Sequence, residues 1–222
     1  MAEDTPYASE EAAWDAYATK DRSQIWARGP ERFHFTQWTL FPAHGPGVEL
    51  IPCGPGTSVL DLGFGACANL AHLASRGGRA IGVDVSRAQV DAARAAHGDR
   101  LELHHDTAER FLTRCREQFD AVVSVFGAVW FCDPEVLLPL ILDRLKPDGV
   151  LVFSHRPPED GEHGRTPHTD VMPAHRWSYA PGEWLDFLAA AGFTEEEAWT
   201  VPPPPTKEGL PGTVIVRGRR PS

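Results

Sequence analysis

The sequence lacks long apolar runs and paired cysteines. No apolar stretch approaches the roughly 20 residues that a membrane span requires, and the acidic N-terminus, Met1 to Asp4, has no apolar signal-peptide core. We therefore expect a cytoplasmic protein with no membrane partner. No C-x-x-C pair is present, so the spacing predicts neither a zinc site nor a redox motif, and we expect free thiols in a reducing compartment. The four cysteines stand at positions 53, 67, 115 and 132.

Positive charge is also scarce. The chain has 21 Lys and Arg against 31 Asp and Glu, which gives a formal net charge of −10. A nucleic-acid backbone would be repelled by that field, so we expect no nucleic-acid partner. At 222 residues, with 42% hydrophobic and 23% charged residues, the composition is typical of one globular α/β domain. We divide it into an N-terminal helical lid, residues 1–50, and a core, residues 51–217.

From residue 57 onward, apolar runs alternate with helical patterns. This alternation predicts parallel βαβ units and a doubly wound α/β sheet with helices on both faces. A long polar loop is expected over residues 156–176, and the last two strands are expected to form a hairpin. The predicted strands are 57–61, 79–84, 101–105, 119–125, 150–154, 194–201 and 213–216. The predicted helices are 68–76, 87–96, 108–114, 134–145 and 181–191.

The stretch from Val59 to Asn69 organises this pattern. An apolar strand ends at Asp61, Gly63 and Gly65 form a tight turn, and a helix then begins near Ala68. Glycine leaves the backbone open to a ligand, and the helix start adds unpaired N–H groups. The spacing also satisfies a relaxed dinucleotide fingerprint. A nicotinamide cofactor and an adenosyl amino acid are therefore both candidate ligands.

Polar residues follow four of the predicted strands, and parallel strand ends meet at one crevice. Asp61 disfavours a pyrophosphate there, since close like charges cost several kcal/mol at an effective dielectric of about 20. The same carboxylate favours an ammonium group. Asp84 is placed to bind a ribose diol, and Asp106 to accept from an adenine amino group. Val85 and Ala108 are expected to form walls for the adenine ring.

These motifs resemble class I S-adenosylmethionine-dependent methyltransferases over about residues 50–217. The resemblance rests on 59–74, Asp84, 106–108, 119–126 and 142–153 with its Lys146-Pro147-Asp148-Gly149 segment. It implies a Rossmann-like, seven-stranded sheet with an antiparallel last strand and S-adenosylmethionine as cofactor. Cys67 departs from the family, which usually has a third glycine there. The cofactor residues predicted in this way are Asp61, Gly63, Gly65, Asp84, Val85, Asp106, Thr107, Ala108, Ser124, Val125 and Phe126.

Residues 1–50 are rich in aromatic side chains. A helix is expected from Glu10 to Lys20 with Ser9 as its N-cap. The aromatics either pack a helical layer onto the core or line a lid in which Trp38 and His44 face a ligand. Trp130 offers the same two alternatives, core packing or an acceptor pocket, and Trp177 and Tyr179 close the long loop as candidates for the far wall of that pocket. The candidate acceptor residues are Trp38, His44, Trp130, Trp177 and Tyr179.

Methyl transfer from a sulfonium is an in-line displacement, in which positioning can contribute up to ~7–11 kcal/mol. A general base is needed only if the acceptor must lose a proton. His155, just after the fifth predicted strand, is the first candidate base, and His34 and His44 are alternatives. His163, His168 and His175 share a loop, but their spacing matches no metal site, so we expect no metal.

The leading hypothesis is methyl transfer to the oxygen, nitrogen or carbon of a small-molecule acceptor. The acidic surface favours a small acceptor, and the Ala-, Arg-, Gly- and Pro-rich composition is compatible with bacterial specialised metabolism. Two alternatives remain: a nicotinamide-dependent dehydrogenase, and a non-catalytic Rossmann-like module that binds a partner through its aromatic N-terminus.

Overall fold

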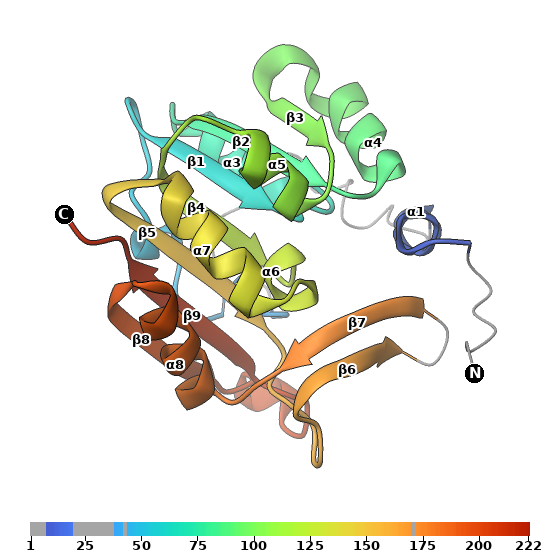
Figure 1. The fold of residues 1–222 in the computed structure, drawn as a ribbon. Coiled ribbons are helices and arrows are strands. Elements are labelled where there is room, and N and C mark those ends of the chain that lie inside the picture. Colours follow the sequence, from blue (N-terminus) through green and yellow to red (C-terminus); the bar gives the residue numbers. More distant parts are fainter. Residues whose placement is uncertain (1–7, 20–37, 42–43, 170–171) are drawn as a thin grey trace.

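The structure, a computed structural model, describes residues 8–19, 38–41, 44–169 and 172–222 (Figure 1). A seven-stranded sheet and a separate two-stranded sheet form its framework. The strands are β1 (Ser58–Leu62), β2 (Arg79–Asp84), β3 (Glu102–His105), β4 (Phe119–Val125), β5 (Leu145–His155), β6 (Gly164–Thr169), β7 (Met172–Ser178), β8 (Thr194–Val201) and β9 (Thr213–Arg219). The α-helices are α1 (Glu10–Thr19), α3 (Ala68–Ser75), α4 (Arg87–His97), α5 (Ala108–Arg114), α6 (Ala128–Phe131), α7 (Pro134–Arg144) and α8 (Pro181–Ala191), and the 3₁₀ turns are η2 (Val48–Leu50), η3 (Gly98–Arg100) and η4 (Pro205–Lys207).

The large sheet has the strand order β3-β2-β1-β4-β5-β9-β8. Strands β1 to β5 pair in parallel, and β9 runs antiparallel to both of its neighbours, β5 and β8. The predicted Rossmann-like sheet with an antiparallel last strand is therefore confirmed. The order reverses between β1 and β4, which places a ligand crevice at the carboxyl ends of these strands.

Two hydrophobic cores cover the two faces of the sheet. Side chains alternate between faces along a strand, so Leu60 and Leu62 join the core beneath α5, α7 and α8, whereas Val59 joins the core beneath α3 and α4. Because both faces of the sheet are buried, the sequences of the central strands are nearly continuous apolar runs. The helices on both faces agree with the prediction.

Several helix boundaries follow from their capping residues. Ser86 caps α4 by accepting a hydrogen bond from the Gln89 N–H at 3.2 Å, and Pro134 occupies the first turn of α7 behind the N-cap Asp133. Gly192 ends α8 in the left-handed conformation with φ 98°, which glycine adopts without a steric penalty. Ser9 accepts from the Ala12 N–H at 3.1 Å at the start of α1, as the sequence predicts.

The structure differs from the predicted long loop over residues 156–176. Most of that segment forms the β6–β7 hairpin, which extends from the end of β5 toward α1 (Figure 1). Its strands carry polar side chains, such as Thr166, whose Oγ1 lies 2.9 Å from Ser178 Oγ, so the sequence shows no apolar alternation. Helix α6 is also absent from the prediction, because four residues are too short to display a helical period.

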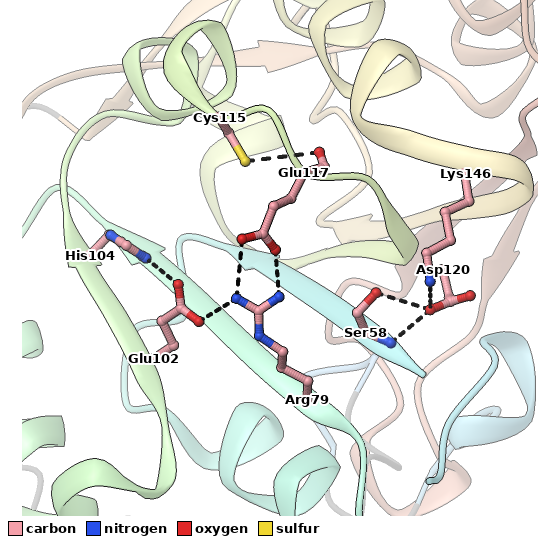
Figure 2. A network of polar contacts seen from close by, with 8 residues as sticks. All are labelled: Ser58, Arg79, Glu102, His104, Cys115, Glu117, Asp120 and Lys146. Carbon is pink, nitrogen blue, oxygen red and sulfur yellow. Dashed lines mark hydrogen bonds and ion pairs between the residues drawn. The ribbon is translucent and has the colours of Figure 1, made fainter. Parts of the chain in front are cut away.

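A polar network joins the amino-terminal ends of the strands, at the edge opposite the crevice (Figure 2). Arg79 pairs with Glu117 and, at 2.6 Å, with Glu102. Asp120 accepts from the Ser58 N–H at 2.7 Å and from Lys146 Nζ at 2.7 Å. These contacts fix strand register, and the half-exposed pairs of Arg79 are each worth at most about 1 kcal/mol. In the part of the chain that the structure describes, no helix is long and apolar enough to cross a bilayer.

Candidate functional site

A cavity of about 490 Å³ lies at the carboxyl ends of β1, β2, β3 and β4. Its floor consists of the turns after these strands, residues 63–66, 83–86, 106–109 and 125–128, and α1 covers one side. Seven residues of the predicted cofactor set are in these turns and line the cavity together with Val125 and Phe126. They are Gly63, Gly65, Asp84, Val85, Asp106, Thr107 and Ala108.

The two glycines of the β1–α3 turn are required for different reasons. At Gly63, φ is 80° and an added Cβ would lie 2.5 Å from the Ala128 N, so this glycine lets α6 pack against the turn. At Gly65, φ is 51° and an added Cβ would meet nothing, while its N–H donates to Asp84 Oδ2 at 2.8 Å. Gly65 therefore presents open backbone to the cavity, as the sequence predicts for a ligand turn.

Asp84 is held by two backbone N–H groups. Besides Gly65, the Ser86 N–H donates to its Oδ1 at 2.9 Å. The carboxylate lines the cavity although only 8% of the residue is exposed. A buried acid fixed by backbone donors at the end of β2 has the position and orientation that a diol ligand requires.

Asp61 lies deeper than predicted. It is 2% exposed and is not among the described residues that line the cavity. Its Oδ1 is buried without a hydrogen-bond partner. Burial, and secondly the nearby charge of Asp84, raise the pKa of Asp61 to about 8. An unpaired buried carboxyl of this kind is costly and marks a site where a cationic ligand group would be favoured.

Asp106 is paired with protein groups. Its Oδ1 accepts from the Thr107 N–H at 3.0 Å and lies 3.2 Å from Arg110 Nε, and its Oδ2 pairs with Arg114. Thr107 in turn caps α5 by accepting from the Arg110 N–H. The carboxylate is therefore less available to an adenine amino group than the sequence suggests, and it orders the turn that carries Thr107 and Ala108.

The segment after β4 has a buried anchor and a strained residue. Ser124 donates to the Leu62 carbonyl at 2.8 Å and accepts from the Val129 N–H at 3.2 Å, so it joins β4 to β1 and does not line the cavity. Phe126, which does line it, has φ 49°. This conformation costs a non-glycine residue about 1–3 kcal/mol, and such strain is common where a side chain must face a ligand.

The five predicted acceptor residues are all outside the described lining of the cavity. Trp38 is fully buried and donates from Nε1 to the Gly47 carbonyl at 2.9 Å, and His44 Nε2 lies 2.7 Å from the Pro202 carbonyl. Trp130 and Tyr179 are core residues, and Trp177 packs against the same core. Trp38 and Trp130 therefore pack in the core, the alternative that the sequence left open for them, and Trp177 and Tyr179 pack there too, whereas His44 contacts the Pro202 carbonyl.

His155 does not face the cavity either. Its ring is fully buried among Trp130, Phe153 and Trp184, with centroids 5.3 to 6.1 Å away. Nδ1 donates to the Arg156 carbonyl at 2.7 Å, and burial lowers the pKa of the imidazole to about 4. The prediction of a base at the crevice does not agree with this placement. The alternative base His34 lies outside the described residues.

Sequence reasoning missed the residues that α1, α5 and α6 contribute to the cavity. Helix α1 is fixed there by Asp15 Oδ1, which accepts from Ser86 Oγ at 2.6 Å and from the Ala88 N–H at 3.0 Å. The stripe of Trp14 and Tyr17 along α1 was the available signal. The lining residues not predicted as site residues include Glu10, Trp14, Tyr17, Glu109, Phe131 and Cys132.

Comparisons with known proteins agree with this geometry. Residues 59–149 match a family model described as "Methyltransferase domain". A ubiquinone biosynthesis O-methyltransferase of Bradyrhizobium diazoefficiens is 34% identical over 111 residues, which are 48% of this chain and 43% of that relative. The chain therefore spans less than half the length of this curated relative.

Solved structures share the fold at low sequence identity. A chain from the complex between the Haloferax volcanii Trm112 methyltransferase activator and a putative methyltransferase has a TM-score of 0.64 at 22% identity, covering 94% of this chain and 98% of that one. The Burkholderia thailandensis 1,6-didemethyltoxoflavin-N1-methyltransferase, solved with S-adenosylhomocysteine bound, has a TM-score of 0.59 at 22% identity, covering 76% and 72%. With its matched methyltransferase domain at residues 59–149, its sheet order and its glycine turn, the chain is similar in sequence and fold to the class I S-adenosylmethionine-dependent methyltransferases.

Proposed function

We propose that this protein transfers the methyl group of S-adenosylmethionine to a small-molecule acceptor. The observation that carries the proposal is the cavity itself, in which the open backbone of Gly65 and the fixed carboxylate of Asp84 meet at the carboxyl ends of β1 and β2. The family match supports this function over the nicotinamide dehydrogenase and the non-catalytic module.

The cofactor residues fit the chemistry of an adenosyl amino acid. Asp84 would accept from the ribose hydroxyls, with Val85 and Ala108 on the adenine ring. The orphaned Oδ1 of Asp61 would accept from the ammonium, beside the open turn at Gly65. In this proposal Asp106 and Thr107 hold the adenine-side turn, while Ser124 fixes the segment that presents Val125 and Phe126 to the transfer site.

When bound, S-adenosylmethionine supplies a methyl carbon activated by its sulfonium. The protein must align an acceptor atom with that carbon and exclude water. Helix α1 closes one side of the cavity and Phe126 projects from its floor. His155, buried and neutral above about pH 4, takes no proton from the acceptor in this scheme. Glu10 and Glu109 also line the cavity, and neither forms an ion pair with a described basic residue.

A small acceptor fits the cavity volume and the net charge of −10. The relatives named above are an O-methyltransferase and an N1-methyltransferase, so their names favour neither oxygen nor nitrogen. We propose that the described parts of the 1–50 segment act as a lid on the 51–217 core within one domain, and that the enzyme acts in small-molecule metabolism.

Calorimetric titration with S-adenosylhomocysteine tests this function directly. We expect binding in the micromolar range, lost by at least about tenfold in Asp84→Ala, and unchanged in the control Asp91→Asn, which removes an exposed carboxylate on α4. Absence of heat with both S-adenosylmethionine and its demethylated product would refute the proposal, as would stabilisation of the protein by NAD alone. Cys67→Gly should not create an affinity that the native chain lacks.

A further inference from the structure

One end of the cavity combines aromatic rings with carboxylates. Helix α1 contributes Glu10 and Trp14, the first turn of α5 contributes Glu109, and α6 contributes Phe131. We call these four residues the acid–aromatic box. They come from three helices and are separate from the strand-end acids assigned above to the cofactor.

The rings of the box contact each other directly. Trp14 and Phe131 pack edge to face with centroids 4.8 Å apart, and Tyr17 also packs edge to face with Trp14, at 5.8 Å. Glu10 Oε1 accepts from Trp14 Nε1 at 3.3 Å, so a carboxylate lies at the edge of this ring. The aromatic faces therefore stand beside a negative charge, which is the arrangement that attracts an organic cation.

The second carboxylate of the box is on α5. Glu109 lines the same cavity as Glu10 and as Cys132, the residue that follows Phe131. Burial, and then the charges of Glu109 and Glu10, raise the pKa of the Cys132 thiol. Glu10 and Glu109 therefore contribute two negative charges to the part of the cavity around Phe131 and Cys132, one from α1 and one from α5.

Nothing basic in the described protein compensates these two charges. Among the described residues that line the cavity there is no Lys, Arg or His. Asp84 is compensated by two backbone N–H groups and Asp106 by two arginines. Neither Glu10 nor Glu109 has an ion pair with a described basic residue. Two carboxylates facing apolar rings without a counter-charge favour a cationic ligand group.

The position of α1, which brings Glu10 and Trp14 to the box, is fixed by several contacts. Asp15 accepts from Ser86 Oγ and the Ala88 N–H, and Glu11 Oε1 lies 3.1 Å from His105 Nε2. On its other side, Ala13 packs against Ala174 of the β6–β7 hairpin. These contacts hold α1, and with it Glu10 and Trp14, in a defined position at the cavity.

From these contacts we propose that the acceptor carries a protonated amine, which binds between Glu10 and Glu109 against the rings of Trp14 and Phe131. The proposal rests on the proposed function and names its substrate class. It concerns recognition of the acceptor, whichever of its atoms receives the methyl group.

Three ligands that differ at one end test the charge preference. Tyramine, 4-(2-hydroxyethyl)phenol and 4-hydroxyphenylacetate share a phenol ring and end in an ammonium, a hydroxyl and a carboxylate. Their binding to the protein saturated with S-adenosylhomocysteine is measured by ligand-observed NMR at up to millimolar concentration. We expect the amine to bind about tenfold more tightly than the alcohol, and the carboxylate to bind weakest. Equal or tighter binding of the alcohol or the carboxylate, or no binding of the amine, overturns the proposal.

Variants assign the preference to the box. Glu10→Gln and Glu109→Gln, which keep side-chain size, should each weaken tyramine binding about tenfold and leave the alcohol unchanged. Trp14→Leu should weaken the amine more than the alcohol, and Asp99→Asn, an exposed acid outside the cavity, is the charge control. If the Gln variants lose S-adenosylhomocysteine affinity instead, the carboxylates serve the cofactor and the inference is wrong. Failure of the native protein to bind S-adenosylhomocysteine contradicts the proposed function, and the three phenols are then compared on the protein without cofactor, so that the charge preference is judged separately.

Discussion

Asp15 on α1 accepts a 2.6 Å hydrogen bond from Ser86, whose own N–H donates to Asp84. Helix α1 is thereby linked through one residue to the carboxylate proposed to bind the ribose. Ser86 also caps α4, so Asp15 lies at the positive end of that helix. This connection makes the closure of the cavity and the geometry of its floor interdependent.

Asp15→Asn should therefore weaken cofactor binding without contacting the cofactor. Loss of a carboxylate at a helix N-terminus costs about 1 kcal/mol, and we expect the Kd for S-adenosylhomocysteine to rise by about three- to tenfold. Calorimetry measures this change, and Asp91→Asn on the surface of α4 is the matched control. An unchanged Kd would show that α1 docks independently of the floor.

The sequence predicted the elements of the fold because their signals are local. Alternation of strands and helices, the N-cap at Ser86 and the proline at the start of α7 each act within a few residues, and each appears where expected. The β6–β7 hairpin escaped prediction because its strands carry polar side chains and pair with each other outside the main sheet. Boundaries shifted most at β5, which begins at Leu145 and includes a left-handed residue, Asp148.

The site was predictable only where topology determines it. Strand ends in a parallel sheet must converge, so Asp84, Val85 and Ala108 could be placed in the cavity from the chain alone. Depth and rotation of a side chain depend on tertiary packing, which is why the sequence placed His155 at the crevice and left two alternatives for Trp130, whereas both side chains are buried. The stripe of Trp14 and Tyr17 indicates that α1 packs through one face, but the place where it docks could not be derived, because the Asp15–Ser86 contact joins distant segments.

Cys67 provides a prediction about thiol reactivity. The residue is fully buried, and burial, followed by the charges of Asp61 and Asp84, raises the pKa of its thiol. Since the thiolate is the reactive form, a disulfide reagent should modify Cys67 only after unfolding, while the partly exposed Cys53 and Cys115 react in the native protein. Comparing native reaction stoichiometry in the wild type and Cys67→Ala measures this, and equal stoichiometry is expected.

Cys67→Gly tests what the departure from the family's glycine costs. The residue has φ 62°, so glycine would relieve about 1 kcal/mol of backbone strain but lose about as much from burial of the thiol. We expect the free energy of unfolding, measured in urea, to change by less than about 1 kcal/mol and S-adenosylhomocysteine affinity to stay within about threefold. A large gain in affinity would mean that Cys67 obstructs the cofactor.

His155 should determine part of the stability at acidic pH. Burial lowers its pKa from an ordinary 6.5 to about 4, so between these values the unfolded chain binds a proton that the folded chain does not. The contribution of His155 to the free energy of unfolding must then fall as pH decreases through this window, by up to about 3 kcal/mol. His155→Leu should remove this contribution, measured as the difference between the wild type and the variant in urea unfolding between pH 4 and 7. An unaltered pH dependence would contradict the buried, neutral imidazole.

Asp61 should act in the opposite direction, over a wider pH range. Its pKa is raised from 3.8 to about 8, so the folded chain keeps a proton that the unfolded chain loses in this window. The contribution of Asp61 to the free energy of unfolding should therefore decline as pH rises from 4 to 8, by up to about 4 kcal/mol at pH 7, and Asp61→Asn should remove this contribution, measured as the difference between the wild type and the variant. Cofactor binding requires the ionised carboxylate if Asp61 pairs with the ammonium, so S-adenosylhomocysteine should bind the wild type more tightly at pH 8.5 than at pH 6.5. The Asn variant should show neither trend, and a wild-type affinity that is independent of pH would place the ammonium elsewhere.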